Sequence, residues 1–324
     1  MISGRASLIR AKPDLCVVAP AHDEEQNLPI LVRELLAVMA QASVAIQILL
    51  VDDGSRDRTA EVIRQLVADH PEVQGLVLAR NFGHQAAISV GLRHAKGRAI
   101  AVMDADLQDR PVDLLALYRR WQTGADVVYA VRRSRQEGMF MRAAYRVFYR
   151  MVARTANIPI PVDSGDFCVM DARFVAQLNQ LPERLRYVRG LRAWLGGRQV
   201  AVPVDRDARR AGVPQYTLFK LFRLAADGLI SFSYVPLQVA SIIGFFVSAT
   251  AFMGALTVLV WKFMGLLPSG AGTATIALSV LFLGGLQLLT IGILGEYVGR
   301  VFDEVKRRPV AVIAEVLQHE NGHD

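Results

Sequence analysis

Cysteine is almost absent from this sequence. Only Cys16 and Cys168 occur among its 324 residues, they lie far apart, and neither belongs to a CxxC pair or a cluster with histidine. A disulfide framework or a structural zinc site needs several such residues at short spacing. The sequence therefore predicts neither, and a reducing compartment fits best.

Glycine-rich phosphate-binding motifs are missing as well. No GxGxxG and no GxxxxGK[ST] follows the first apolar run, so the dinucleotide-binding and P-loop interpretations lack their phosphate cradle. Met1–Lys12 has no sustained apolar core, so no signal peptide is expected and the first domain should stay where it is made. The net charge of +7 suits nucleic acid, anionic lipid or a phosphorylated substrate. No basic motif interleaved with aromatic residues is present, and a nucleic-acid partner is not expected.

Two long stretches lack Asp, Glu, Lys and Arg altogether. Val235–Trp261 and Ala274–Gly295 each exceed the roughly 20 apolar residues that cross the hydrocarbon core of a bilayer. The alternative is a pair of buried helices in a soluble protein, but two such runs joined only by residues 262–273 would make an unusually apolar core. The sequence predicts a transmembrane hairpin.

Basic residues flank this hairpin on both outer sides, which predicts cytoplasmic termini by the positive-inside rule. The expected organisation is a cytoplasmic catalytic domain over 1–230 that includes amphipathic interface helices, two transmembrane helices over 231–300, and a cytoplasmic tail over 301–324. Glycines on the spans permit close helix packing and with it a homo-oligomer. The flanking basic residues are Arg206, Arg209, Arg210, Lys220, Arg223, Arg300, Lys306, Arg307 and Arg308.

Short apolar or β-branched runs alternate with helical patterns in the first part of the chain. This repetition predicts an α/β domain with a mainly parallel sheet and helices on both faces. Ligands of such sheets bind at the carboxyl ends of the strands. The expected strands are Leu15–Ala19, Ile46–Val51, Gly75–Ala79, Ala99–Met103 and Val127–Ala130, and the expected helices include Leu28–Ala40, Thr59–Ala68 and Gln85–His94.

Acidic residues cluster where three of these strands end. Glu24 follows the first strand, Asp52 and Asp53 the second, and Asp104 and Asp106 the fourth, so the three clusters should converge on one rim. The Asp104-x-Asp106 pair presents hard oxygen ligands to Mg²⁺ or Mn²⁺, and diphosphate oxygens and water would complete the metal shell. For Asp52 and Asp53, capping of the next helix competes with accepting a hydrogen bond from a nucleobase or ribose.

Arginines concentrate after the fifth strand. Arg142, Arg146, Arg150 and Arg154 are spaced four apart and so share one face of a helix. That face is either simply solvated or lies on anionic lipid headgroups. The nearby spans favour the lipid interpretation.

A series of motifs occurs in a fixed order along the chain: VAPAHDEEQN, VDDGSRDRT, ARNFGHQAAISVGL, MDADLQD, VDSGDFCVMDARF, YVRGLRAWLG, RDARRAGVPQY, SFSYVPL and GEYVGRVFDEVKRRP. This series resembles the family 2 glycosyltransferases that glycosylate polyprenyl phosphates. It is most similar to the bacterial undecaprenyl-phosphate glucosyltransferases and aminoarabinosyltransferases, which are related to the dolichyl-phosphate mannosyl synthases. The resemblance extends from Cys16 to Pro309 and includes both spans.

The resemblance implies a Rossmann-like GT-A catalytic domain before the hairpin, and it assigns roles to single residues. Asp166 matches the presumed catalytic carboxylate. Cationic groups are also needed, because two phosphorylated substrates repel each other. The resemblance implies that the nucleoside is bound by Pro20, Glu24 and Asp52 or Asp53. It implies that the metal and the donor diphosphate are bound by Asp104, Asp106 and Gln108. The phosphates of donor and lipid would be neutralised by Arg132, Arg135, Arg206 and Arg209.

The implied reaction is the metal-dependent, inverting transfer of a sugar to a polyprenyl phosphate, expected to be undecaprenyl phosphate. The donor is a nucleotide diphosphate sugar, with a UDP-sugar expected in preference to a GDP-sugar. The resemblance places the enzyme in the bacterial inner membrane, where the polyprenyl monophosphate sugar forms at the cytoplasmic face. Because the spans between Val235 and Trp261 carry no ionisable residue, a chain that ends near Asp227 is expected still to bind the donor.

Two rival functions fit less well. A processive polysaccharide synthase would carry a QxxRW motif and more spans, and Arg192-Ala-Trp194 is only a partial echo. A catalytically dead adaptor that binds nucleotide sugars would not need the Asp104-x-Asp106 pair beside Asp166. The chain departs from the family at Gln215, where a lysine is usual, and at His22, where a tyrosine is usual. Gln215 cannot supply the positive charge of a lysine, so either the phosphate contacts differ from those of the family or the acceptor or donor is unusual.

Overall fold

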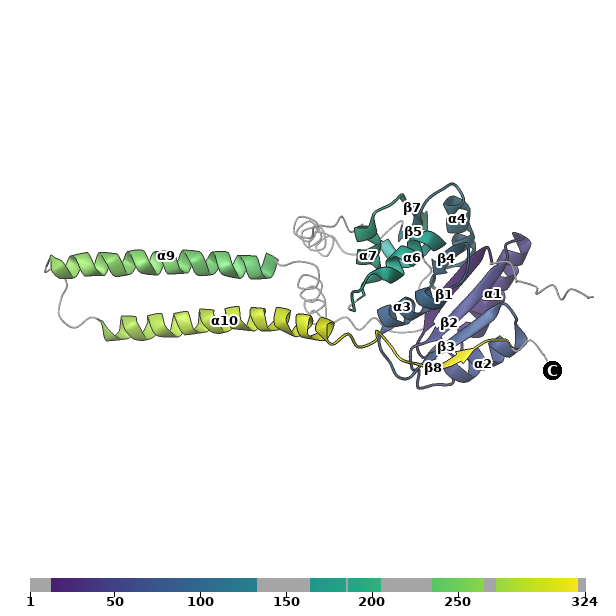
Figure 1. Ribbon diagram of the computed structural model, residues 1–324, viewed down its shortest axis with the longest axis horizontal. Helices are drawn as coiled ribbons and strands as arrows, with labels where there is room; N and C mark the ends of the chain where they lie inside the picture. Colours follow the sequence, from purple (N-terminus) through teal and green to yellow (C-terminus); the bar gives the residue numbers. More distant parts are fainter. Residues whose placement is uncertain (1–12, 133–163, 185, 205–234, 265–271, 320–324) are drawn as a thin grey trace, which may run out of the picture. The chain divides into compact units, whose positions relative to one another are not determined.

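A computed structural model describes residues 13–132, 164–184, 186–204, 235–264 and 272–319 of the chain (Figure 1). These residues form two compact units, one that holds the sheet and one that holds the two long apolar helices. Arg135, Arg206, Arg209, Gln215 and the predicted basic helix around Arg142–Arg154 lie outside the described residues.

The first unit is built on a sheet whose order, over the described residues, is β7-β5-β6-β4-β1-β2-β3-β8. Strands β6 and β8 run antiparallel to their neighbours, and the other ladders are parallel. The mainly parallel sheet that the sequence predicts is therefore confirmed. The strands are β1 (Leu15–Ala21), β2 (Ile46–Asp52), β3 (Val73–Leu78), β4 (Ala99–Val102), β5 (Val127–Arg132), β6 (Ser164–Asp171), β7 (Gln199–Val204) and β8 (Ile313–Leu317).

Helices cover both faces of this sheet, as predicted (Figure 1). Helices α1, α2 and α4 pack on one face, and α3, α6 and α7 pack on the other. A parallel sheet needs both layers because its strands are apolar on both sides. The helices are α1 (Leu28–Gln41), α2 (Thr59–Asp69), α3 (His84–His94), α4 (Pro111–Trp121), α6 (Ala172–Gln180) and α7 (Val188–Leu195).

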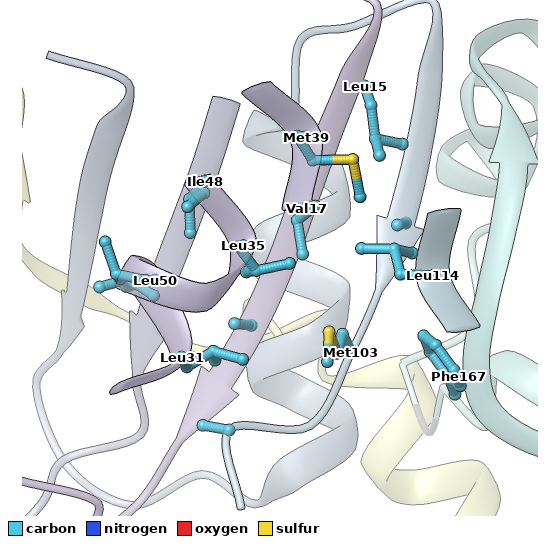
Figure 2. Packing of buried hydrophobic residues seen from close by; sticks show 14 of the residues in the cluster. Leu15, Val17, Leu31, Leu35, Met39, Ile48, Leu50, Met103, Leu114 and Phe167 are labelled. Carbon is cyan, nitrogen blue, oxygen red and sulfur yellow. The ribbon is translucent and has the colours of Figure 1, made fainter. Parts of the chain in front are cut away.

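The central strand β1 shows how the core is built. Every residue of β1 is buried, because successive side chains alternate between the two helix layers. Leu15 and Val17 lie toward Leu35 and Met39 of α1, as Figure 2 shows, whereas Val18 belongs to the core on the opposite face. Full burial of each such side chain contributes roughly 1.5–3 kcal/mol. This rigid double core fixes the carboxyl ends of the strands, where the acidic residues lie.

The last strand, β8, comes from the segment that follows the apolar helices and pairs antiparallel with β3 at the edge of the sheet. Leu317 packs against the core, and a Cβ on Gly75 would lie only 3.1 Å from its Cδ1. Glu315 Oε2 accepts a hydrogen bond from Arg64 Nη2 at 2.7 Å, and His319 Nδ1 lies 3.0 Å from the carbonyl oxygen of Val67. The segment expected as a tail over 301–324 thus contains a strand of the catalytic domain.

We expect a chain that ends at Arg307, and so keeps both apolar helices but lacks β8, to unfold at a clearly lower temperature than the full chain. The loss of the β3–β8 hydrogen bonds, at about 1 kcal/mol each, and of Leu317 should cost at least ~2 kcal/mol. Thermal unfolding of both proteins in the same detergent measures the difference. Glu315→Gln, which removes only the exposed ion pair, should change stability by less than about 1 kcal/mol.

The donor binding that we expect of a chain ending near Asp227 stays a prediction, and the structure adds a condition to it. Such a chain lacks β8 and leaves the edge of β3 uncovered. An unchanged unfolding temperature for the chain that ends at Arg307 would show instead that β8 is dispensable to the catalytic domain.

The second unit consists, over its described residues, of α9 (Val235–Phe263) and α10 (Thr273–Val305), which lie side by side (Figure 1). Both are long and apolar enough to cross a membrane, with mean hydropathies of 2.1 and 1.3 over their candidate spans, and neither span is buried. Phe246 is 65% exposed and Leu288 is 72% exposed, which a buried helix pair would not show. The two helices are candidate membrane spans, and their exposure favours that interpretation over two soluble core helices.

Helix α10 continues beyond the apolar run that the sequence marks. The predicted span ends at Gly295 and the predicted domain boundary lies at residue 300, but the helix ends at Val305. Charged residues extend it, because Arg300 and Glu296 pair one turn apart at 3.2 Å, a spacing that stabilises helices.

The position of β8 fixes one feature of the topology. Strands β1 to β7, which precede α9 in the chain, and β8, which follows α10, belong to the same sheet. They must therefore lie on the same side of any membrane that the two helices cross.

Candidate active site

The carboxyl ends of β4, β1 and β2 lie next to one another, because these strands are parallel neighbours. Ala21 at the end of β1 pairs in register with Asp52 at the end of β2. Glu24 follows β1, and Asp104 follows β4 by two residues. The sheet thus brings the three predicted acidic clusters together at the carboxyl ends of its parallel strands.

Asp52 and Asp53 are both buried and hold different loops. Asp52 accepts hydrogen bonds from the backbone N–H, at 3.1 Å, and the hydroxyl of Ser55. Asp53 accepts from the N–H groups of Phe82 and Gly83 at 2.8 and 2.9 Å, which ties the loop before α3 to the end of β2. Burial raises the pKa of Asp52, and the bonds from Ser55 oppose that shift.

The capping interpretation of Asp52 and Asp53 is not what the structure shows. Asp57 Oδ1 accepts the hydrogen bond from the N–H of Thr59 at 3.0 Å, at the start of α2. The two buried aspartates therefore fix the loops at the carboxyl ends of the strands and do not cap α2.

The loops at the ends of β1 and β2 are packed tightly against the loop before α3. Pro20 is a buried residue of β1, and the N–H of Glu24 donates to Thr59 Oγ1 at 2.9 Å. His22 Nδ1 lies 3.1 Å from the carbonyl oxygen of Asp53. Gly54 has a φ of +61°, and a Cβ there would lie 2.3 Å from the carbonyl carbon of Arg80. Only glycine allows this approach of two backbones.

Asp104 and Asp106 lie in a short, bent segment after β4. Asp106 Oδ1 accepts a hydrogen bond from the N–H of Gln108 at 3.1 Å, so Gln108 joins this turn through its backbone. Leu107, between Asp106 and Gln108, has a φ of +57°, which is an unfavourable conformation for a non-glycine residue. The bend keeps the two carboxylates near the edge of the sheet.

Asp166 lies opposite Asp104 across the β4–β6 ladder. The last register pair of this antiparallel ladder is Val102 with Cys168, and two further steps along each strand lead to Asp104 and Asp166. His84, the first residue of α3, bridges them, because its Nε2 lies 3.5 Å from Asp104 Oδ1 and 3.5 Å from Asp166 Oδ2.

Asp166 is held by two further side chains. Arg189 of α7 donates from Nε to Oδ1 at 2.8 Å and from Nη2 to Oδ2 at 2.9 Å. Gln85 donates from Nε2 to Oδ2 at 3.0 Å, and its Oε1 accepts from the N–H of Val188 at 3.0 Å. Gln85 therefore joins Asp166 to the start of α7.

These contacts decide the charge of Asp166. Burial alone would raise the pKa of its carboxyl group, but the contacts with His84 and Arg189 outweigh burial and hold the pKa well below its usual range. The contact with Asp166 raises the pKa of His84, and burial opposes that shift. The lowered pKa keeps Asp166 ionised at neutral pH, beside the positively charged Arg189 and the hydrogen-bond donor Gln85.

The sequence predicts part of this arrangement and misses the rest. His84, Gln85 and Arg189 were not among the predicted site residues, although they occur in the motifs ARNFGHQAAISVGL and YVRGLRAWLG. Their roles depend on the pairing of β4 with β6, which no local pattern reveals. Arg132 is the last residue of β5, and its side chain is not among those the structure describes.

Comparison with known proteins gives this arrangement a family. Residues 16–178 match the model of glycosyl transferase family 2. An uncharacterized glycosyltransferase of Synechocystis is 38% identical over 94% of this chain and 95% of its own length. The bactoprenol glucosyl transferase of Shigella phage SfII is 36% identical over 92% of this chain and 97% of its own length.

Among solved structures, mannosyl-3-phosphoglycerate synthase of Rubrobacter xylanophilus is 20% identical over 70% of this chain and 74% of its own, with a TM-score of 0.47. The family match and the sequence relatives agree with the GT-A-like sheet and its acidic edge. The chain belongs to glycosyltransferase family 2 and resembles the bactoprenol glucosyl transferases over most of its length.

Proposed function

We propose that this glycosyltransferase moves a sugar from a nucleotide diphosphate sugar, with a UDP-sugar preferred to a GDP-sugar, onto undecaprenyl phosphate or a similar polyprenyl phosphate. The observation that carries the proposal is the extent of the likeness to bactoprenol glucosyl transferases. The alignment covers 92% of this chain, which is far more than the catalytic domain alone. A lipid acceptor also accounts for the two exposed apolar helices, because they would hold the enzyme in the membrane that contains the acceptor.

The residues present fit a divalent cation. Over the described residues there is no group of three or more acidic, histidine or cysteine side chains that could hold a metal by themselves. Mg²⁺ is commonly bound by one or two carboxylates together with substrate phosphates, and Asp104 and Asp106 supply that set. When bound, Mg²⁺ or Mn²⁺ would neutralise charge on the donor diphosphate.

The chemistry requires little proton transfer. An oxygen of the lipid phosphate forms a bond to the anomeric carbon, and the bond from that carbon to the nucleoside diphosphate breaks, with inversion at the carbon. A phosphate monoester has a second pKa near 6, by analogy with phosphorylated side chains, so much of the acceptor is already a dianion at neutral pH. The ionised, fully engaged Asp166 suits electrostatic positioning better than proton abstraction.

The same proposal places the reaction at the cytoplasmic face of the bacterial inner membrane. The pairing of β8 with β3 requires both flanks of the helix hairpin to lie on one side. Arg300, Lys306, Arg307 and Arg308 follow the second candidate span, and such basic flanks favour the cytoplasmic side.

A direct assay tests the proposal. The full chain in lipid nanodiscs is incubated with undecaprenyl phosphate and a panel of radiolabelled UDP- and GDP-sugars, and the lipid phase is analysed. We expect one sugar to become extractable with the lipid and labile to mild acid, as a glycosyl phosphate. Label that appears in free sugar or in protein, with none in the lipid for any donor, would contradict the proposed acceptor.

A further inference from the structure

We propose that Arg189 binds a phosphate oxygen of a substrate and that Asp166 acts through Arg189, as the residue that positions its guanidinium group. The inference rests on the proposed function, because it identifies the group that meets a phosphorylated substrate in that site. It reverses the roles that the family resemblance suggests, where Asp166 itself acts on the substrate.

Exposure is the first argument. The side chain of Asp166 is only 4% exposed, whereas that of Arg189 is 34% exposed and that of His84 is 47% exposed. A substrate that enters this site therefore meets the guanidinium and the imidazole before it meets the carboxylate. Both of these groups suit an oxyanion.

The second argument is that α7 is rigidly placed and so presents Arg189 in a fixed position. Val188 and Leu191 are buried in the core, and Gln85 accepts a hydrogen bond from the N–H of Val188. One turn after Arg189, the buried Arg192 guanidinium lies 5.1 Å from the centre of the Tyr129 ring. A prearranged cation is more effective than a mobile one, because it loses less side-chain freedom when the ligand binds.

The geometry of the Arg189–Asp166 pair is the third argument. Asp166 holds Nε and Nη2 of Arg189 with two parallel hydrogen bonds, which fixes the plane of the guanidinium. Asp104 lies across the ladder from Asp166 and belongs to the proposed metal-binding pair. Arg189 therefore provides positive charge at the side of the site where the carboxylates alone would repel a phosphate.

The phosphate belongs either to the lipid acceptor or to the donor diphosphate, and the two sources are separable by direct binding. The full chain in detergent is titrated by calorimetry with farnesyl phosphate as the acceptor probe and with UDP plus Mn²⁺ as the donor probe. Farnesol and uridine, which lack phosphate, are the matched neutral ligands. These measurements need no turnover, so they remain decisive if the proposed sugar transfer fails.

The variants are Arg189→Gln, Arg189→Lys, Asp166→Asn and the double change of Asp166→Asn with Arg189→Gln. Arg173→Gln is the matched control, because Arg173 also pairs with an aspartate, Asp171, at 3.1 Å but is 89% exposed. Arg173 lies at the start of α6, just after the end of β6 that is farther from Asp166. Thermal unfolding of every variant confirms that it is folded.

We expect Arg189→Gln to lower the affinity for one phosphate probe by about tenfold or more. Arg189→Lys should lower that affinity less, and Arg173→Gln should leave it unchanged. Weaker binding of farnesyl phosphate identifies the acceptor phosphate as the ligand of Arg189, and weaker binding of UDP identifies the donor diphosphate. Either result supports the proposal. Farnesol and uridine should bind every variant alike.

The double variant distinguishes phosphate binding from simple support of Asp166. If Asp166 acts through Arg189, Asp166→Asn weakens the probe no more than Arg189→Gln does, and it causes no further loss when Arg189 is already glutamine. A double variant that binds the probe clearly more weakly than Arg189→Gln alone would overturn the proposal, as would unchanged affinity of Arg189→Gln for both probes. An Arg189→Gln protein that does not fold leaves Arg189→Lys to decide by the same comparison, made with and without Asp166→Asn.

Discussion

Replacement of Asp106 by asparagine is expected to lower sugar transfer by about 100- to 1000-fold while the fold stays intact. The loss follows from the charge, because a neutral amide is a poor ligand for Mg²⁺ or Mn²⁺ and offsets no charge on the diphosphate. The fold should survive because the Oδ1 atom of asparagine can still accept the hydrogen bond from the N–H of Gln108.

The measurement is turnover as a function of Mn²⁺ concentration, together with the affinity for UDP with and without the metal. Asp113→Asn serves as the matched control, since Asp113 lies on the nearby α4 and pairs with Arg110 at 2.8 Å. Wild-type activity that persists after exhaustive chelation would show that the pair Asp104 and Asp106 does not work through a metal.

Asp166→Asn and Asp166→Ala are both expected to lose about 100-fold or more of their activity at every pH between about 5 and 9, with no recovery at high pH. The absence of a recovery at high pH follows from the lowered pKa of Asp166. A carboxylate with a depressed pKa is ionised throughout this range, so its own titration cannot produce a pH dependence there. Wild-type activity should therefore rise with ionisation of the acceptor phosphate at about pH 6.

A pH–rate profile at saturating metal and donor checks this expectation. If Asp166 were the base that deprotonates a monoanionic phosphate, the variants would regain activity above about pH 7, where solvent has already removed that proton. Alkaline recovery of Asp166→Ala would thus contradict a positioning role. The ion pair also affects stability with a defined sign, because its contribution should persist above the unfolded-state pKa of aspartate and be lost only as the pH falls into the acid range.

The parallel core of the fold could be predicted from the sequence because its signals are local. Ile46–Val51 is a continuous apolar run between helical patterns, and the strand is found at Ile46–Asp52. Strands β6 and β8 are different, because each is antiparallel and pairs with residues distant in the chain. Ile313–Leu317 is only five residues long and is separated from the other strands by the two apolar helices, so its local pattern does not assign it to the sheet.

The candidate site divides in the same way. Asp104 and Asp106 are recognisable because they directly follow a buried strand and are two residues apart. His84 and Arg189 are not, because an arginine or histidine at a helix start is usually a solvated side chain. Their significance arises only when the β4–β6 ladder brings Asp166 opposite Asp104. Only the resemblance pointed to Asp166, and it gave neither the ion pair nor the low exposure.

The late position of β8 has a consequence for how the protein is made. A ribosome that synthesises this chain releases β1–β7 first, then α9 and α10, and β8 last. Until then the edge of β3 has no partner, and an open strand edge favours aggregation. If α9 and α10 span the membrane, a chain in which only one of them inserts would carry β8 to the opposite side, and its sheet could not be completed. Completion of the sheet would therefore report correct insertion of the anchor, and misinserted chains would remain open to proteolysis.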